Sequence, residues 1–194
     1  MKRFVFTTLT ILGALAMTTA NAVEIKDPEN TLFLDLKDGR VTIQMFPQQA
    51  PNHVARIKEL AREGYYNGKK WHRVIDGFMA QTGSPNGDGI GGSSKPDLKA
   101  EFNGMSHVRG VASMARTNMP DTANAQFFIM LASNPGLDGQ YTVWGQVIDG
   151  MDKVDNIKKG NARLNGSVDQ PDEIVKITVA ADEKATASDK TAAK

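Results

Sequence analysis

The chain has 194 residues, of which 40% are hydrophobic and 23% charged, and it contains no cysteine. A chain of this length can bury one hydrophobic core without covalent support, and the lack of cysteine excludes disulfide bridges and thiolate metal sites. The 23 basic and 22 acidic side chains nearly cancel, so the charge gives no indication of nucleic acid or anionic lipid as a partner.

Residues 1–22 predict a cleavable secretory signal peptide. Lys2 and Arg3 precede an apolar run, residues 4–17, and the small residues Ala20-Asn21-Ala22 follow, which is the order of regions in such a leader. The apolar run is shorter than the roughly 20 residues of a membrane-spanning helix, so we expect no membrane span. Cleavage after Ala22 would take two of the 23 basic side chains and leave 21 against 22 acidic ones, a net charge of −1.

In chain order, the first elements after the leader are a hairpin and a helix. Residues 31–36 and 41–46 are strand-like runs on either side of Asp38-Gly39, and a D-G pair between apolar runs is a strong hairpin signal. Apolar residues then recur at helical spacing over 51–63, a segment that begins with proline and is followed by Gly64. The spacing predicts an amphipathic helix that lies on a sheet.

The segment 71–81 predicts a second hairpin and contains an unusual charge. Its D-G pair, Asp76-Gly77, lies between two apolar runs, so Arg73 is placed on a strand. A mostly buried arginine costs several kcal/mol unless it is paired or faces a solvent-filled cleft. This segment alone is compatible with both interpretations of Arg73, a structural salt bridge and a ligand cleft.

A glycine-rich segment follows over residues 82–94. Residues 87–92 formally match G-x-G-x-x-G, but Ser93-Ser94-Lys95-Pro96 comes next rather than a helix. The helix N-terminus that cradles phosphate in such motifs is therefore missing. We do not expect nucleotide binding, and the sequence favours a flexible surface loop.

The second half of the chain predicts more strands and one short helix. Because eight strands and two helices joined by hairpin turns are expected in all, the pattern favours an antiparallel barrel or sandwich covered by helices. Residues 181–194 lack any large apolar side chain and are predicted to be a disordered polar tail, which leaves one domain over 23–180. The later strands are expected at 111–115, 126–130, 141–147 and 173–179, and the helix at 150–159.

The common catalytic motifs are missing from the sequence. The histidines lack metal-ligand spacing, and no serine has a recognisable nucleophile motif or a base nearby in sequence. Metal and covalent chemistry are therefore not expected, and an enzyme with this sequence would work by shape and hydrogen bonding. The histidines are His53, His72 and His107, and the serines include Ser84, Ser93, Ser94 and Ser113.

A series of motifs in the chain resembles those of the cyclophilins, a family of peptidyl-prolyl cis-trans isomerases. The resemblance covers nearly the whole domain, from the Leu32 hairpin to Val179. Together with the leader, these motifs make the chain similar to a bacterial periplasmic member of the family. The motifs are Gly64-Tyr65-Tyr66, His72-Arg73-Val74-Ile75, Gly77-Phe78-Met79-Ala80-Gln81, the glycine-rich loop, Ser113-Met114-Ala115, Ala125-Gln126-Phe127-Phe128-Ile129 and Leu137-Asp138-Gly139.

The resemblance implies a fold and a site. The fold would be mainly β, an eight-stranded antiparallel β-barrel capped by two α-helices, with the site on the outer face of the barrel and no cofactor. Arg73 matches the family's catalytic arginine. The proline pocket is matched by Phe78, Met79, Phe128 and Leu137, and the peptide groove by Gln81, Ala115, Arg116 and Gln126.

The sequence departs from the family pattern at several site positions. Tyr141 occupies a position where many members have histidine, so the pocket keeps a ring with a different polar tip. Gly136 replaces a tryptophan that contacts cyclosporin in several members, which puts sensitivity to that inhibitor in doubt. Arg116-Thr117 replaces the Asn-Ala of eukaryotic members. Since the family's contacts there are largely made by backbone, we expect the site to tolerate this change of side chains.

Strand geometry adds two predictions. In an ideal two-residue hairpin at Asp76-Gly77, Arg73 would lie on the opposite face from Met79 and Gln81. The implied site needs all three together, so we predict a bulge or irregular turn near residues 76–78. In the same way, neighbouring strand residues point to opposite faces, which assigns Phe127 to the core and Phe128 to the pocket.

The implied activity is isomerisation of X-Pro bonds in exported proteins, which would assist their folding. We expect a monomer in the periplasm that acts on proline-containing polypeptides. A binding module that holds unfolded segments without turnover is the alternative, and Arg73 distinguishes the two, since holding needs the apolar pocket but no donor tuned to a twisted amide. Asn165-Gly166-Ser167 fits a glycosylation sequon, but this means little in a bacterial periplasm.

Overall fold

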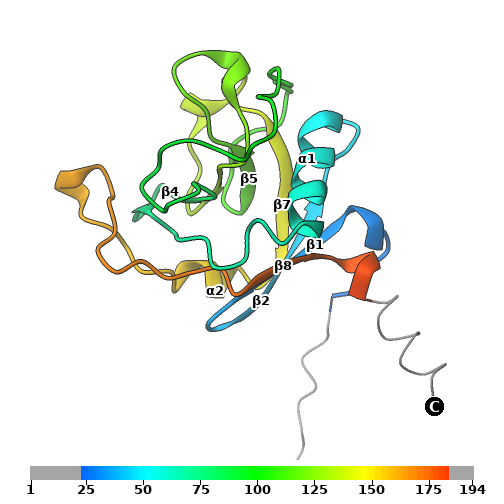
Figure 1. Cartoon of the computed structure of the whole chain (residues 1–194), viewed down its shortest axis with the longest axis horizontal. Helices are drawn as coiled ribbons and strands as arrows, with labels where there is room; N and C mark the ends of the chain where they lie inside the picture. Colours follow the sequence, from blue (N-terminus) through cyan, green and yellow to red (C-terminus); the bar gives the residue numbers. More distant parts are fainter. Residues whose placement is uncertain (1–22, 184–194) are drawn as a thin grey trace, which may run out of the picture.

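In the computed structural model, which describes residues 23–183, eight antiparallel strands form one sheet with the order β3-β4-β6-β5-β7-β2-β1-β8. The sheet curls around a hydrophobic core (Figure 1). The predicted leader, residues 1–22, lies outside the described residues. The strands are β1 (Thr31–Leu36), β2 (Gly39–Met45), β3 (Arg73–Ile75), β4 (Met79–Thr82), β5 (Val111–Met114), β6 (Phe127–Met130), β7 (Val143–Asp149) and β8 (Lys176–Val179).

Two α-helices cover the sheet, so the predicted fold class is confirmed. Helix α1 (Pro51–Arg62) packs against β8, and α2 (Met151–Asp155) packs against β2 (Figure 1). No helix within residues 23–183 combines the length and apolarity needed to cross a membrane. The short 3-10 helices are η1 (Pro28–Asn30), η2 (Pro120–Thr122), η3 (Pro135–Leu137) and η4 (Ala162–Leu164).

The edge strands β3 and β8 are joined through the segments beside them. Backbone Gly68 donates to Ile174 O at 2.8 Å, and the Ile174 N–H returns a bond to Lys69 O at 2.8 Å. The Trp71 N–H donates to Asp172 O at 2.9 Å. These bonds satisfy backbone groups that an open sheet edge would leave unpaired, and they close the curled sheet into a barrel.

The start of helix α1 is capped by a residue far away in sequence. Ala50 precedes the helix and has no side chain that could accept a hydrogen bond. Instead, the carboxylate of Glu101 accepts from the backbone N–H groups of Asn52 and His53, each at 3.1 Å. A carboxylate stabilises the positive end of the helix dipole, so the long segment between β4 and β5 is tied to α1.

The turn between β3 and β4 confirms the predicted irregularity. Ile75 pairs with Met79, so three residues form the turn and Arg73 lies directly opposite Gln81. Gly77, in the middle of that turn, has a φ of +68°, a conformation that glycine adopts without steric cost. The extra residue shifts the register by one position and brings Arg73 to the face of Gln81.

The sheet has a hydrophobic cluster on each face. The larger fills the barrel and includes Phe127, whose ring makes edge contacts with Tyr66, Trp71 and Trp144. The smaller lies on the outer face and includes Phe128. The predicted assignment of Phe127 to the core and Phe128 to the other face is therefore confirmed, and it follows from the two-residue period of a strand.

The described part of the chain continues past the predicted domain boundary at Ala180. Residues 180–183 are helical. Asp182 accepts from Arg62 Nε at 3.0 Å, and Glu183 accepts from Arg40 Nη1 at 2.8 Å. These ion pairs attach the start of the predicted tail to α1 and β2. Residues 184–194, the rest of that tail, lie outside the described residues.

Candidate active site

The register of the sheet places predicted site residues in one row on its outer face. Arg73 on β3 pairs with Gln81 on β4, Gln81 pairs with Phe128 on β6, and Phe128 pairs with Ser113 on β5. Residues directly opposite one another in a sheet share a face. The row therefore brings a cation, an amide, an aromatic ring and a hydroxyl together from four strands.

Arg73 is half-buried and held by neutral acceptors. Its Nη1 donates to Oε1 of Gln81 at 3.0 Å and lies 3.8 Å from the sulfur of Met79. Nε donates to the backbone oxygen of Asn165 and Nη2 to Oδ1 of the same residue, both at 3.0 Å. A planar guanidinium that is bound on two sides has a fixed orientation.

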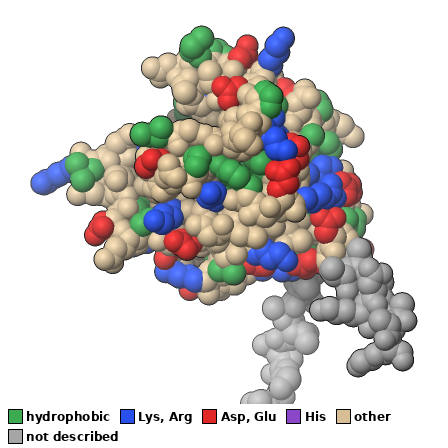
Figure 2. Space-filling model, in the orientation of Figure 1, with side chains coloured by type: hydrophobic (Ala, Val, Ile, Leu, Met, Phe, Trp, Pro, Cys, Tyr) green, Lys and Arg blue, Asp and Glu red, His purple; other side chains and the backbone are tan. Residues whose placement is uncertain are grey.

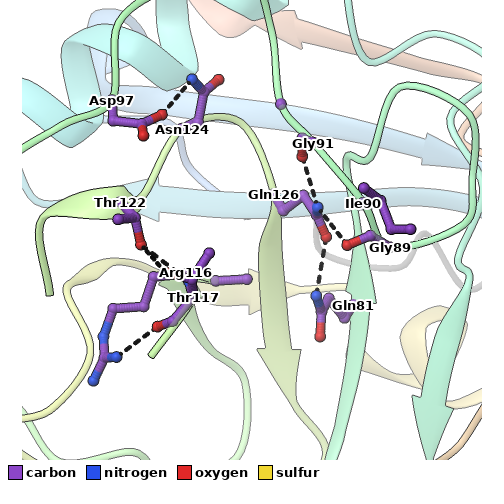
Figure 3. Close-up of a pocket in the computed structure, with 12 residues that line it drawn as sticks. Gln81, Gly89, Ile90, Gly91, Asp97, Arg116, Thr117, Thr122, Asn124 and Gln126 are labelled. Atoms are coloured by element: carbon purple, nitrogen blue, oxygen red, sulfur yellow. Dashed lines mark hydrogen bonds between the residues drawn. The ribbon is translucent and has the colours of Figure 1, made fainter. Parts of the chain in front are cut away.

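The hydrogen bond from Arg73 to Gln81 is the first in a directional chain. Gln81 Nε2 donates to Gln126 Oε1 at 3.0 Å, and Gln126 Nε2 donates to the backbone oxygens of Gly89 and Gly91 at 3.0 and 2.8 Å (Figure 3). The two carbonyl groups accept only, so they fix which end of the Gln126 amide faces them. That orientation in turn directs the oxygen of Gln81 toward Arg73.

The structure favours a ligand cleft over a structural salt bridge for Arg73. Across residues 23–183, no carboxylate forms an ion pair with its guanidinium. Burial lowers the pKa of Arg73 below its ordinary value, an effect opposed by the nearby Tyr141. Arginine remains protonated at neutral pH even so, and its positive charge therefore lies uncompensated at the edge of the site.

An apolar hollow of about 150 Å³ lies beside Arg73. Hydrophobic side chains gather near the middle of the face shown in Figure 2, with charged side chains around them. Every predicted substrate-binding residue except Gln126 lines this hollow. Gln126 lines a second hollow beside it. The hollow is lined by Arg73, Phe78, Met79, Gln81, Ala115, Arg116, Phe128, Leu137 and Tyr141.

Aromatic rings stiffen the inner wall of this apolar hollow. Phe128 and Tyr141 meet edge to face with centroids 5.6 Å apart, and His107 stacks on Phe128 at 6.2 Å. The guanidinium of Arg116 lies over the ring of Tyr141 at 4.6 Å, within the range of a cation–π contact. The ring at position 141 is therefore kept, as the sequence indicated, and its face is covered by Arg116.

Although no serine has a recognisable base nearby in sequence, the fold brings Ser113 to a histidine. Ser113 Oγ lies 2.9 Å from His107 Nε2, and His107 Nδ1 lies 3.0 Å from Asp138 Oδ1. Because the carboxylate accepts only, Nδ1 of His107 donates to Asp138. Ser113 is 0% exposed and His107 1%. These hydrogen-bonded side chains therefore support Phe128 from behind and do not reach a substrate. Sequence reasoning missed this group because its members come from three separate segments.

A second, larger hollow of about 460 Å³ adjoins the first and shares Gln81, Ala115 and Arg116 with it. Its opposite wall is the glycine-rich loop. The loop is held by Gln126 and by the bond from Ser93 N to Asn124 Oδ1 at 2.8 Å, which shows that it is part of the site and not a free surface loop. The two hollows together form a groove, and Arg116 lines both of them.

Gly136, where several family members have tryptophan, directly precedes a residue that lines the apolar hollow. Gly136 is exposed in η3, and its N–H donates to Oδ1 of Asn134 at 3.0 Å. Leu137, the next residue, points into the hollow. Gly136 itself lines neither hollow.

Among residues 23–183, no group of three or more side chains could hold a metal ion, and Ser113 with its histidine is buried. The site instead consists of one fixed guanidinium beside an apolar hollow on the outer face of a small antiparallel barrel. This arrangement defines a peptide-binding, non-covalent class of protein, because an apolar hollow and oriented hydrogen-bond donors are suited to hold a chain.

Comparison with known proteins identifies the family. The chain belongs to the cyclophilin-type peptidyl-prolyl cis-trans isomerases, since residues 31–179 match the family model described as "Cyclophilin type peptidyl-prolyl cis-trans isomerase/CLD". It is therefore an enzyme of this family, acts on proline-containing polypeptides and needs no cofactor.

Relatives and solved structures agree with this assignment. A probable peptidyl-prolyl cis-trans isomerase of Brucella suis biovar 1 (strain 1330) is 52% identical over 182 residues, covering 88% of this chain and 93% of the relative. A peptidyl-prolyl cis-trans isomerase of Helicobacter pylori is 39% identical over 145 residues, covering 71% and 88%. The crystal structure of cyclophilin AquaCyp293 from Hirschia baltica has a TM-score of 0.72 and 29% identity, covering 80% of this chain and 76% of that one.

Proposed function

We propose that the protein accelerates rotation about X-Pro bonds in exported polypeptides, with Arg73 as the catalytic group and the apolar hollow as the proline pocket. The observation that carries this proposal is the position of Arg73. Its guanidinium lines the same hollow as Phe128, Met79 and Leu137, with its orientation set by Gln81 and Asn165.

The chemistry requires a fixed ring and a donor. Rotation about the X-Pro bond passes a barrier near 20 kcal/mol because it breaks amide resonance. If Phe128 and Met79 hold the pyrrolidine ring, the other side of the bond can turn. In the twisted state the proline nitrogen regains its lone pair and becomes a hydrogen-bond acceptor. A guanidinium beside that nitrogen stabilises the twisted state more than either planar state.

The energetic demand on these groups is moderate. Lowering the barrier by about 7 kcal/mol would accelerate rotation roughly 10⁵-fold. A charge-assisted hydrogen bond contributes about 1.5–3 kcal/mol, so desolvation of the bond in the pocket has to supply much of the rest. Both effects need an apolar wall and a cation that is not already neutralised by a carboxylate. The hollow beside Arg73 meets both conditions.

Related proteins support a peptide in this groove. The crystal structure of a cyclophilin-type isomerase of Cryptosporidium parvum, determined in the presence of the dipeptide Ala-Pro, has a TM-score of 0.70 and 27% identity and covers 77% of this chain and 98% of that one. We propose that an X-Pro segment occupies the corresponding surface here, with its proline in the hollow lined by Phe128 and Leu137 and its preceding residues in the adjoining hollow, which Arg116 also lines.

The test is the cis-to-trans rate of a short X-Pro peptide with wild type and Arg73→Ala, measured together with equilibrium binding of the same peptide. We expect a rate loss of at least about 100-fold in kcat/KM, as is common when a transition-state donor is removed, with binding mostly retained. Arg163→Ala, an exposed arginine in η4, is the matched control and should behave as wild type. Near-full activity of Arg73→Ala would contradict the proposal.

We propose further that the protein works in the periplasm as a monomer. The leader pattern of residues 1–22 supports the location. Mass spectrometry of the protein from periplasmic extracts of a bacterial host should find an N-terminus at Val23, and sedimentation should give the mass of one chain. An uncleaved protein that stays in the cytoplasmic fraction would contradict the proposed location.

A further inference from the structure

Asn165 supplies two of the acceptors that hold Arg73, and both are on one edge of the guanidinium. Nε donates to its backbone oxygen and Nη2 to its Oδ1, each at 3.0 Å. Arg40 uses the same two nitrogens to bind the carboxylate of Asp35, at 2.7 and 3.0 Å. Asn165 therefore takes the place that a carboxylate has in a bidentate arginine pair.

The replacement of a carboxylate by an amide and a carbonyl has an electrostatic consequence. A carboxylate at this edge would fix the arginine equally well, but it would also neutralise its charge. Asn165 is neutral, so the guanidinium keeps its full charge for a substrate. Transition-state stabilisation by a cation depends on charge that is not already compensated.

The bonds to Asn165 also determine which donors of Arg73 are left. Nη1 gives one N–H to Gln81, and its other N–H has only the sulfur of Met79 at 3.8 Å. Nη2 gives one N–H to Asn165, and residues 23–183 provide no acceptor for its second N–H. The donors that remain for a substrate are therefore at the end of the guanidinium opposite Nε.

The loop that carries Asn165 is attached to β3 itself. The Val74 N–H donates to Gly166 O and the Gly160 N–H donates to Val74 O, both at 2.8 Å. This loop projects from the barrel beside the site, drawn in orange in Figure 1. Asn165 adopts a left-handed conformation with φ 52° and ψ 35°, which asparagine tolerates better than most residues. The backbone therefore sets the distance between Asn165 and Arg73.

We propose that Asn165 is a positioning residue for isomerisation: it orients Arg73 from the side away from Gln81 while leaving the charge of Arg73 free for the twisted peptide bond. This inference rests on the proposed catalytic role of Arg73. It also gives a function to the Asn165-Gly166-Ser167 segment, for which the glycosylation pattern offered none.

The test compares two glycine substitutions in one loop. Asn165 and Gln170 are the two non-glycine residues with positive φ in the described chain, so Asn165→Gly and Gln170→Gly both relieve backbone strain. Only Asn165→Gly removes an acceptor from Arg73. We expect it to lower kcat/KM about 5-fold, the effect of one ordinary hydrogen bond, with peptide Kd and Tm nearly unchanged. Gln170→Gly should match wild type.

A double-mutant cycle shows whether the effect passes through Arg73. Added to Arg73→Ala, Asn165→Gly should reduce the residual rate no further. The side-chain Nε–H signal of Arg73 in ¹⁵N NMR should also broaden or shift in Asn165→Gly and stay in place in Gln170→Gly. The inference would be overturned if Asn165→Gly were fully active or if Gln170→Gly lost as much kcat/KM. It would also be overturned if Asn165→Gly caused the same loss of kcat/KM in the Arg73→Ala background. Full activity of Arg73→Ala would instead refute the proposed role of Arg73.

Discussion

Gln81 lies directly opposite Arg73 across the β3–β4 hairpin, and its side-chain oxygen accepts a hydrogen bond from Nη1 of that arginine at 3.0 Å. The other end of the same amide donates to Gln126, which donates in turn to the glycine-rich loop. The orientation of the proposed catalytic group therefore depends on a loop that does not touch it.

This dependence predicts the effect of Gln126→Glu. The substitution replaces an N–H donor by an oxygen that faces the carbonyl groups of Gly89 and Gly91, so the loop and the amide of Gln81 lose their fixed positions. We expect kcat/KM to fall about 10-fold, which corresponds to roughly 1.4 kcal/mol of transition-state stabilisation. Isomerisation kinetics with an X-Pro peptide measure this loss of kcat/KM.

Gln146→Glu is the matched control for that experiment. The amide of Gln146 on β7 also donates to two carbonyl oxygens, those of Arg109 and Val147, both at 3.2 Å, but it lines neither hollow. We expect isomerase activity close to wild type. An equal loss in both variants would show that the hydrogen-bond chain does not act on Arg73.

Phe127→Leu and Phe128→Leu should separate stability from activity. Phe127 is 0% exposed and touches three aromatic rings, so its replacement should lower the free energy of unfolding by about 1–2 kcal/mol with activity retained in the folded fraction. Phe128→Leu should cost less stability and more kcat/KM, because it changes the wall of the proline pocket. Urea unfolding and isomerase kinetics on both variants check this, and equal activity losses would contradict the assignment of faces.

The pH dependence of stability should differ from that of activity. Burial lowers the pKa of His53 and of His72 below the ordinary value of 6.5. Because their folded pKa is depressed, the unfolded chain binds more protons below that value. The stability they contribute is complete above pH 6.5 and is lost as the pH falls through the lower, folded pKa.

Activity should stay flat over the same range, because Arg73 does not titrate near neutral pH. Thermal melts from about pH 7.5 down to pH 5 should show a falling Tm, while kcat/KM changes little as long as the protein is folded. The Glu101 carboxylate, whose pKa is lowered against the effect of burial by hydrogen bonds from His53 and Asn52, should add a second loss below pH 4.5. A rate that follows a pKa near 6 would indicate a catalytic histidine instead.

Gly136 should decide the response to cyclosporin. Its φ lies outside the range reserved for glycine, and an added Cβ would come only 3.1 Å from Oδ1 of Asn134, so a side chain fits after a small shift. We expect weak inhibition of wild type by cyclosporin, and Gly136→Trp should strengthen it at least about 10-fold by adding apolar contact area. Inhibition curves on both proteins check this, with tight inhibition of wild type as the contrary result.

The sequence by itself determined the elements, and its resemblance to the cyclophilins implied the site residues. Local signals were sufficient for the elements: D-G pairs marked both hairpins, helical spacing marked 51–63, and the two-residue period of a strand separated Phe127 from Phe128. The same period showed that a regular turn at Asp76-Gly77 could not bring Arg73 to the face of Gln81. The three-residue turn in the structure resolves that conflict.

Only the tertiary structure decided what surrounds Arg73. Asn165 reaches it across 92 positions of the chain, Gln126 connects it to the glycine-rich loop, and Ser113, His107 and Asp138 meet behind Phe128. None of these contacts has a local sequence pattern, because hydrogen bonds between distant segments depend on how the strands are ordered and where the loops close back. Strand periodicity specifies a face, but the partners on that face are chosen by the closing of the barrel.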